Sequence, residues 1–216
     1  MLKKFLAVGA AALALSAFAS ASITHSLQAV AGAYPITSGA ADSTAPNYTN
    51  GTYYVVDLMA TVGAGDDWTQ TSLSVGGATG ARVTNGTFFD HSLNLGSPSG
   101  DNPPNPALFP VFPALQWDSY YVASDGTTPS YAGSATTTPT QRSAVWFSTP
   151  PNGGAGTFRI GRFTIIANGA WSLNVQGGST TVQGGGTIFP FNLTIPEPST
   201  LALLVLGSVA GLIRRR

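Results

Sequence analysis

Apolar and polar residues alternate through most of residues 51–195, in short stretches separated by glycine, proline and asparagine. Alternation with a period of two places successive side chains on opposite faces of an extended strand. The stretches predicted as strands are residues 52–62, 68–75, 81–84, 87–89, 117–123, 142–148, 157–167, 170–176, 180–183 and 187–195. Many short strands with turn residues between them are typical of β-sandwiches and jelly rolls. We therefore predict an all-β body, a single antiparallel β-sandwich of jelly-roll type.

Two details of this pattern make specific predictions. In residues 157–167 strict alternation places Ile160 and Arg162 on one face of the strand, and Arg159 and Phe163 on the other. Asn-Gly at residues 85–86 and again at 168–169 stands between predicted strands, and this dipeptide favours a two-residue β-hairpin turn. We therefore expect a hairpin at each of these two positions.

Other parts of the chain lack strong alternation. Residues 22–50 are rich in alanine, serine, threonine and glycine, and we predict an irregular lead-in with at most one short edge strand near residues 27–31. Residues 96–113 contain six prolines, which cannot donate the hydrogen bonds of a central strand. Because this loop also carries Leu108, Phe109, Val111 and Phe112, we expect it to pack over an edge of the core.

Composition supports the all-β reading and limits the possible functions. Strong helix formers are scarce between residues 22 and 195, and the chain has no cysteine, so no disulfide can stabilise it. This segment has four arginines and no lysine against eight aspartates, so its net charge is −4. A basic stripe of the kind that binds nucleic acid is absent, and we expect no nucleic-acid partner.

The first 21 residues have the organisation of a secretory signal peptide. Lys3 and Lys4 precede an apolar stretch, and small residues follow at Ala19 and Ala21. We predict a signal helix over residues 1–21 and cleavage by signal peptidase between Ala21 and Ser22, with cleavage after Ala19 as the alternative. The body would then be exported.

The last 22 residues contain three parts in a fixed order. Pro196, Glu197 and Pro198 come first, and the two prolines prevent a helix interior or a central strand there. Residues 201–213 are uncharged, and a helix of that length spans about 20 Å against the roughly 30 Å of a bilayer core. The chain then ends in three arginines, Arg214, Arg215 and Arg216, which favour the cytoplasmic side of the membrane. We predict a short transmembrane helix over residues 199–213, with the arginines as a stop-transfer signal.

This order of Pro-Glu-Pro, short apolar helix and terminal arginines resembles the C-terminal sorting signal of PEP-CTERM proteins. The resemblance covers residues 195–216, and Ile195 stands where valine is commoner. It implies that an exosortase, a membrane-embedded cysteine protease, recognises Pro196, Glu197 and Pro198 and removes the anchor. It also implies an inner-membrane intermediate and delivery to the surface or polysaccharide matrix of a Gram-negative-type bacterium. The body, residues 51–194, is loosely similar to cohesin-like and carbohydrate-binding sandwiches.

Few residues of the body suggest catalysis or metal binding. Asp66 and Asp67 stand in a glycine-rich turn and are candidates for a calcium site, with Asp57 or Asp101 as a further ligand. Aspartate is, however, common in turns for local hydrogen-bonding reasons. His91 follows Asp90 at a strand end and is the best residue for a secreted hydrolase, but no Gly-x-Ser-x-Gly motif presents a nucleophile. His25 is expected to be exposed. We predict no catalytic residues, no metal and no cofactor.

The four tryptophans at positions 68, 117, 146 and 171 have two possible roles. On sandwich strands such rings usually fill the core, and they also form the stacking platforms that bind sugars. The sequence therefore leaves two functions open beside the hydrolase. One is a structural or matrix-associated exported protein without catalytic activity, and the other is a module that binds a glycan or a partner protein.

Overall fold

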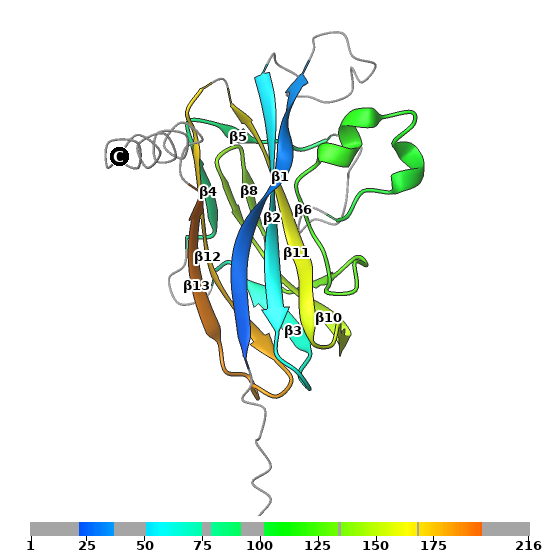
Figure 1. The fold of residues 1–216 in the computed structure, drawn as a ribbon, viewed down its shortest axis with the longest axis vertical. Helices are drawn as coiled ribbons and strands as arrows, with labels where there is room; N and C mark the ends of the chain where they lie inside the picture. Colours follow the sequence, from blue (N-terminus) through cyan, green and yellow to red (C-terminus); the bar gives the residue numbers. More distant parts are fainter. Residues whose placement is uncertain are drawn as a thin grey trace, which may run out of the picture.

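The computed structural model describes residues 22–36, 51–74, 79–91, 102–133, 135–167 and 169–195. Its strands form two antiparallel sheets that pack against each other (Figure 1). The five-stranded sheet consists of β1 (Ile23–Ile36), β2 (Gly51–Val62), β5 (Thr87–Phe88), β6 (Tyr120–Tyr121) and β11 (Gly156–Ala167). The eight-stranded sheet consists of β3 (Trp68–Ser72), β4 (Ala81–Thr84), β7 (Ser130–Tyr131), β8 (Thr136–Thr138), β9 (Gln141–Ser143), β10 (Val145–Asn152), β12 (Ser172–Thr181) and β13 (Phe189–Ile195). The predicted all-β antiparallel sandwich is confirmed.

The main core lies between the two sheets and is built from the inward residues of their longest strands. Leu58 of β2, Phe163 of β11 and Leu173 of β12 are among its fully buried members. Burying an aliphatic or aromatic side chain of this size stabilises a fold by about 1.5–3 kcal/mol. Without a disulfide, this buried apolar surface is the main source of stability of the body.

The chain before residue 51 differs from the predicted lead-in. Residues 23–36 form β1, which pairs with β2 along nearly its whole length, with a shift in register between Ala29 and Ala33. Polar and small residues hid this strand, because an edge strand that is half exposed needs few apolar side chains. Ile23 is buried in the core and Leu27 packs against it. The predicted edge strand near residues 27–31 is therefore present but much longer than expected, and the irregular lead-in is wrong for the rest of residues 23–36. Residues 37–50 lie outside the described part of the chain.

The two Asn-Gly positions are crossings between sheets, which makes the hairpin predictions wrong. β4 and β5 flank residues 85–86, but β4 pairs with β12 and β9 while β5 pairs with β11 of the other sheet. β11 and β12 flank residues 168–169 and likewise belong to different sheets. Asn85 has a positive φ of 56° but Gly86 does not, so the two residues do not form the type I′ turn that this dipeptide favours. An Asn-Gly dipeptide indicates where the chain turns, but it does not determine the partners of the two strands that flank it.

The proline-rich loop covers the outer face of the five-stranded sheet. Its described part contains two short 3-10 helices, η2 (Pro106–Leu108) and η3 (Pro113–Trp117). A second small core forms beneath it, made of Tyr53, Phe89, Ala114 and Ile166 with Trp117 packed alongside. The prediction that the loop packs down is correct in this region, although Leu108 and Val111 remain exposed.

The structure also bears on the predicted membrane segments. No helix within the described ranges combines the length and the apolar character needed to cross a bilayer. The predicted signal helix, residues 1–21, and the predicted transmembrane helix, residues 199–213, both lie outside those ranges.

Candidate functional site

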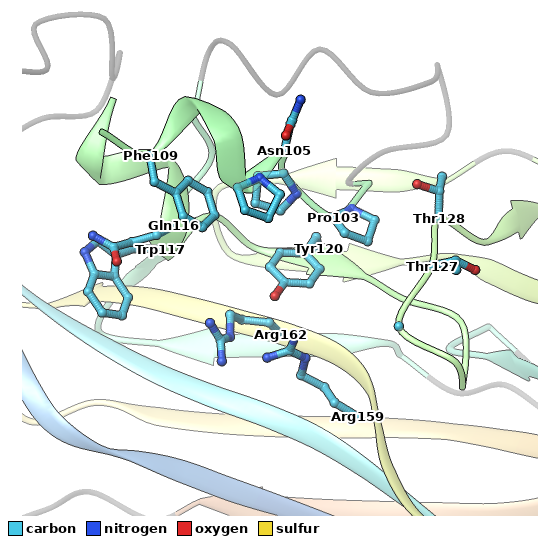
Figure 2. Close-up of a pocket in the computed structure, with 13 residues that line it drawn as sticks. Pro103, Asn105, Phe109, Gln116, Trp117, Tyr120, Thr127, Thr128, Arg159 and Arg162 are labelled. Carbon is cyan, nitrogen blue, oxygen red and sulfur yellow. The ribbon is translucent and has the colours of Figure 1, made fainter. Parts of the chain in front are cut away.

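A pocket of about 680 Å³ lies between the proline-rich loop and β11 (Figure 2). This size is within the ordinary range for small-ligand sites. Its apolar lining comes from prolines 103, 104 and 106 with Phe109, Trp117 and Tyr120. Its polar lining comes from Asn105, Gln116, Thr127, Thr128, Arg159 and Arg162. The pocket therefore joins an aromatic wall to a cationic floor.

A β-bulge in β11 places both arginines on the same face of the sheet. Arg159 is opposite Met59 of β2 and Gly161 is opposite Leu58, so Ile160 is an extra residue in the pairing. Ile160 turns into the core, where it is fully buried. Strict alternation would separate residues 159 and 162, so the sequence prediction of opposite faces is wrong. Bulges of this kind redirect side chains, and here the bulge directs two guanidinium groups into one pocket.

Asp57 on β2 is the counter-ion of both arginines. Arg162 Nε donates to Asp57 Oδ1 at 2.7 Å and Arg162 Nη2 donates to Asp57 Oδ2 at 3.0 Å, which is a bidentate pair. Arg159 is more distant, with its Nη1 3.5 Å from Asp57 Oδ2. The side chains of Asp57 and Arg162 are 13% and 15% exposed, whereas that of Arg159 is 35% exposed. Two guanidinium groups share this carboxylate, and Asp118 is a second carboxylate close enough to Tyr120 to raise its pKa.

Tyr120 lies over both arginines. Its ring centroid is 5.4 Å from the guanidinium carbon of Arg159 and 5.9 Å from that of Arg162, within the range of cation–π attraction. Burial raises the pKa of Tyr120 above its ordinary value, although the two arginines act in the opposite direction. The phenol therefore stays protonated at neutral pH and can donate a hydrogen bond.

The tryptophans divide between core and pocket. Trp68, Trp146 and Trp171 are buried, and Trp146 stacks on Tyr121 with ring centroids 4.4 Å apart. Trp117 is half-buried and lines the pocket. A platform made from all four rings is thus excluded, and one tryptophan stays available to a ligand.

The two turn aspartates are held by backbone hydrogen bonds, of which only one comes from a residue next in the sequence. Asp66 Oδ1 accepts from the backbone N–H groups of Asp67 and Gln183, each at 2.8 Å, and Asp67 Oδ1 accepts from the N–H of Gly154 at 2.8 Å. Burial opposes ionisation of Asp66, but hydrogen bonds from Thr181, Gln183 and Asp67 hold its pKa below the ordinary value. No set of three acidic or histidine side chains gathers around a metal position in the described ranges. Asp57, suggested as a further calcium ligand, is paired with the arginines instead, and Asp101 is outside the described residues.

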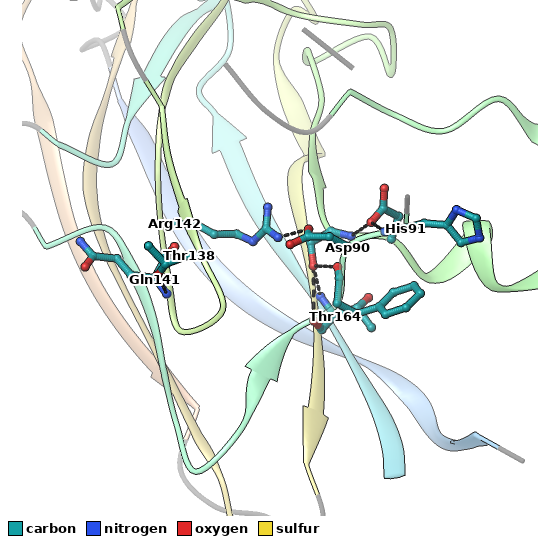
Figure 3. Close-up of polar contacts among 9 residues, drawn as sticks. Asp90, His91, Thr138, Gln141, Arg142 and Thr164 are labelled. Atoms are coloured by element: carbon teal, nitrogen blue, oxygen red, sulfur yellow. Dashed lines mark hydrogen bonds and ion pairs between the residues drawn. The ribbon is translucent and has the colours of Figure 1, made fainter. Parts of the chain in front are cut away.

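His91 and Asp90 do not form a catalytic pair. Arg142, which is buried, forms an ion pair with Asp90, and the His91 ring points to the other side (Figure 3). The backbone N–H of His91 donates to Asp118 Oδ1 at 2.8 Å, and its ring packs near Phe89 and Phe112. His91 is only 3% exposed, so this arrangement supports the structure of the sheet end.

His25 is more enclosed than the sequence suggests. It lies on β1, its Nε2 is 2.8 Å from Ser179 Oγ of β12, and its ring is 4.2 Å from that of Phe191 of β13. Burial lowers the pKa of His25 to about 4, so the ring is neutral at ordinary pH. The prediction of an exposed histidine is therefore wrong, because residues 23–36 form a strand, β1, on which His25 packs against β12 and β13.

The predicted processing residues stand at the two ends of the described body. Ser22 is exposed and immediately precedes β1, whereas Ala19 and Ala21 lie outside the described ranges. Pro196, Glu197 and Pro198 and the three terminal arginines also lie outside them. The last described residues, Thr194 and Ile195, pair with Asn174 and Leu173 of β12. The chain thus leaves the sandwich directly from the end of β13.

Comparison with known families decides the nature of this C-terminal segment. Residues 194–216 match the PEP-CTERM protein-sorting motif. The resemblance drawn from Pro-Glu-Pro, the apolar stretch and the arginines is confirmed, over about a tenth of the chain. The PEP-CTERM match begins at Thr194, so its first two residues are the last two of β13. No curated protein matches the chain.

The PEP-CTERM motif implies an exported protein that an exosortase processes at the membrane. This conclusion rests on the C-terminal segment alone. The pocket, in contrast, was not found from the sequence, because it depends on the bulge at Ile160 and on the fold of the loop above β11. The available signal was the closeness of Trp117 and Tyr120 to the proline-rich segment.

Proposed function

We propose that the chain is a non-catalytic exported protein that an exosortase delivers to the cell surface or to the extracellular polysaccharide matrix, where its body has a structural or matrix-associated role. The observation that supports this most is the PEP-CTERM motif, which begins within the last strand of a self-contained sandwich. A folded body attached directly to a removable membrane segment can be released intact.

The features of the body agree with a role outside catalysis. The histidine best placed for hydrolysis is buried, and the aspartate next to it is paired with Arg142. The two turn aspartates are occupied by backbone donors. These four side chains, Asp66, Asp67, Asp90 and His91, thus hold loops and sheet ends in place.

Replacing Glu197 tests the sorting step. Glu197 is the only glutamate in the chain, and Glu197→Ala removes the single charge within Pro-Glu-Pro. If the exosortase reads this side chain, the variant keeps its anchor and fractionates with the inner membrane, whereas the unaltered protein loses the anchor and leaves the membrane. Intact mass and cell fractionation in a host that has an exosortase measure both outcomes.

A matched control removes one negative charge elsewhere. Asp125→Asn alters an exposed carboxylate in the body and should be processed like the unaltered protein. If Glu197→Ala gives the same mature mass and the same location as Asp125→Asn, sorting through this motif is refuted.

A binding module for a glycan or a partner protein is the second candidate. It is favoured by the pocket in which Trp117 and Tyr120 stand beside Arg159 and Arg162. Both candidates are compatible with export, and they differ in whether the body recognises a ligand.

A further inference from the structure

We propose that the pocket between the proline-rich loop and β11 binds an acidic sugar residue of a polysaccharide, with its carboxylate on Arg159 and its ring against the aromatic wall. The inference rests on the proposed function for the place where such a ligand would be met. Its test uses the purified protein and does not depend on sorting.

The first argument is charge. The body between residues 22 and 195 has a net charge of −4, yet the side chains that line this pocket include two arginines and no carboxylate. Of the two arginines, Arg159 is the more exposed. A negatively charged ligand group is therefore attracted to this position.

The second argument is the unequal use of the two arginines. Arg162 is committed to Asp57 through two short hydrogen bonds, whereas Arg159 is 3.5 Å from the same carboxylate. Among the described residues, Arg159 Nε is a buried nitrogen without a hydrogen-bond partner, so any contact with a ligand falls to the Nη groups of Arg159. Because Arg159 is also the more exposed of the two, it is the arginine that a ligand can reach. Arginine binds a carboxylate well, because two of its N–H groups can donate to the two carboxylate oxygens at once.

The third argument is the shape of the remaining lining. Phe109, Trp117 and three prolines present flat apolar surfaces, and Asn105, Thr127 and Thr128 add amide and hydroxyl groups. A sugar ring has an apolar face and an edge of hydroxyl groups, so it can use both kinds of surface at once. A bare inorganic anion would use only the arginine, and a neutral sugar would leave the positive charge without a partner.

Titration calorimetry of the full chain, purified in a mild detergent, tests the proposal. The probes are tetragalacturonate and tetraglucuronate, the methyl esters of both, and tetraglutamate. We expect at least one of the two acidic oligosaccharides to bind, its methyl ester to bind at least tenfold more weakly, and tetraglutamate to bind at least tenfold more weakly than the sugar. We also expect binding to weaken as salt is added, because the contact is ionic.

Arg159→Gln removes the charge that the proposal assigns to the ligand. Loss of a charge-assisted hydrogen bond should weaken binding by about tenfold or more. Arg82→Gln is the matched control, since Arg82 is exposed on β4 of the other sheet and should leave the affinity unchanged. Thermal unfolding of both variants verifies that they are folded, and the comparison of acid with ester needs no variant.

Several results would overturn the inference. These are the absence of binding by either acidic oligosaccharide, equal binding of acid and ester, and full affinity in folded Arg159→Gln. Equal or tighter binding of tetraglutamate would assign the pocket to an acidic peptide of a partner protein instead. None of these results changes the mature mass of the chain, so failure here is distinguishable from failure of the sorting proposal.

Discussion

At the scale of single residues, a largely buried chain of polar side chains links the two sheets of the sandwich. His25 of the five-stranded sheet contacts Ser179 Oγ, which is 2.7 Å from Thr71 Oγ1 of the eight-stranded sheet. Trp68 Nε1 donates to the same Thr71 oxygen at 2.9 Å. Buried polar groups cost stability unless they are paired, and here each group named has a partner.

The lowered pKa of His25 predicts a dependence of stability on pH. The folded ring titrates at about 4 and the unfolded ring at its ordinary value of 6.5. Above pH 6.5 both states are neutral, but as pH falls from 6.5 to 4 the unfolded state takes up the proton first, so the free energy of unfolding decreases. The loss at pH 4.5 relative to pH 7 is about 2–3 kcal/mol.

Denaturant unfolding at pH 7 and pH 4.5 measures this effect. His25→Gln keeps a polar side chain but cannot titrate, so its loss of stability between the two pH values should be smaller than that of the unaltered protein by about 2–3 kcal/mol. Equal losses in the two proteins would show that His25 does not control the acid sensitivity.

The sequence predicted residue roles well where chemistry is local and poorly where it depends on distant strands. Asp66 follows the local expectation only in part, because it accepts from the N–H of the next residue, Asp67. Its second donor, Gln183, lies 117 positions away, and Gly154, the donor to Asp67, lies 87 positions away. The partner of Asp90 is Arg142, more than fifty positions away, and that of His25 is Ser179, more than 150 positions away. Such pairs follow from strand order, which alternation alone does not determine.

At the scale of elements, β12 is the strand on which the eight-stranded sheet is built. It pairs with β13 along one edge and with β3 and β4 along the other. Gly177 is a tightly packed position of β12, since a Cβ atom there would be 2.5 Å from the backbone oxygen of Ser72. The position therefore requires glycine for lack of space.

Gly177→Ala should destabilise the fold. The new methyl group forces β12 and β3 apart, and overpacking of this kind costs about 1–3 kcal/mol. Gly169→Ala is the matched control, because a Cβ atom there would meet nothing within 4 Å. Chemical denaturation of the two variants should show a clear loss for Gly177→Ala only, and similar midpoints would contradict the packing that β12 shows.

Elements were predicted better than their partners. Residues 52–62 and 157–167 were expected as strands, and β2 and β11 cover nearly these ranges. The bulge at Ile160 was missed, since one extra residue brings Arg159 and Arg162 to the same face without changing the composition of the strand. β1 was missed as a long strand because an edge position tolerates its polar and small side chains.

At the scale of the whole molecule, the PEP-CTERM motif and the sandwich are continuous. β13 ends at Ile195, and the matched motif begins one residue earlier, at Thr194. The last strand of the body is therefore also the start of the sorting segment. The body keeps its pairing with β12 up to that point, so removal of the residues that follow leaves the described strands intact.

The intact mass of the protein recovered from outside the inner membrane of its own cells tests the central claim most directly. We predict a chain that begins at Ser22 and lacks both the apolar segment of residues 201–213 and the three terminal arginines. A recovered chain that retains residues 1–21 and runs to Arg216 would contradict the account.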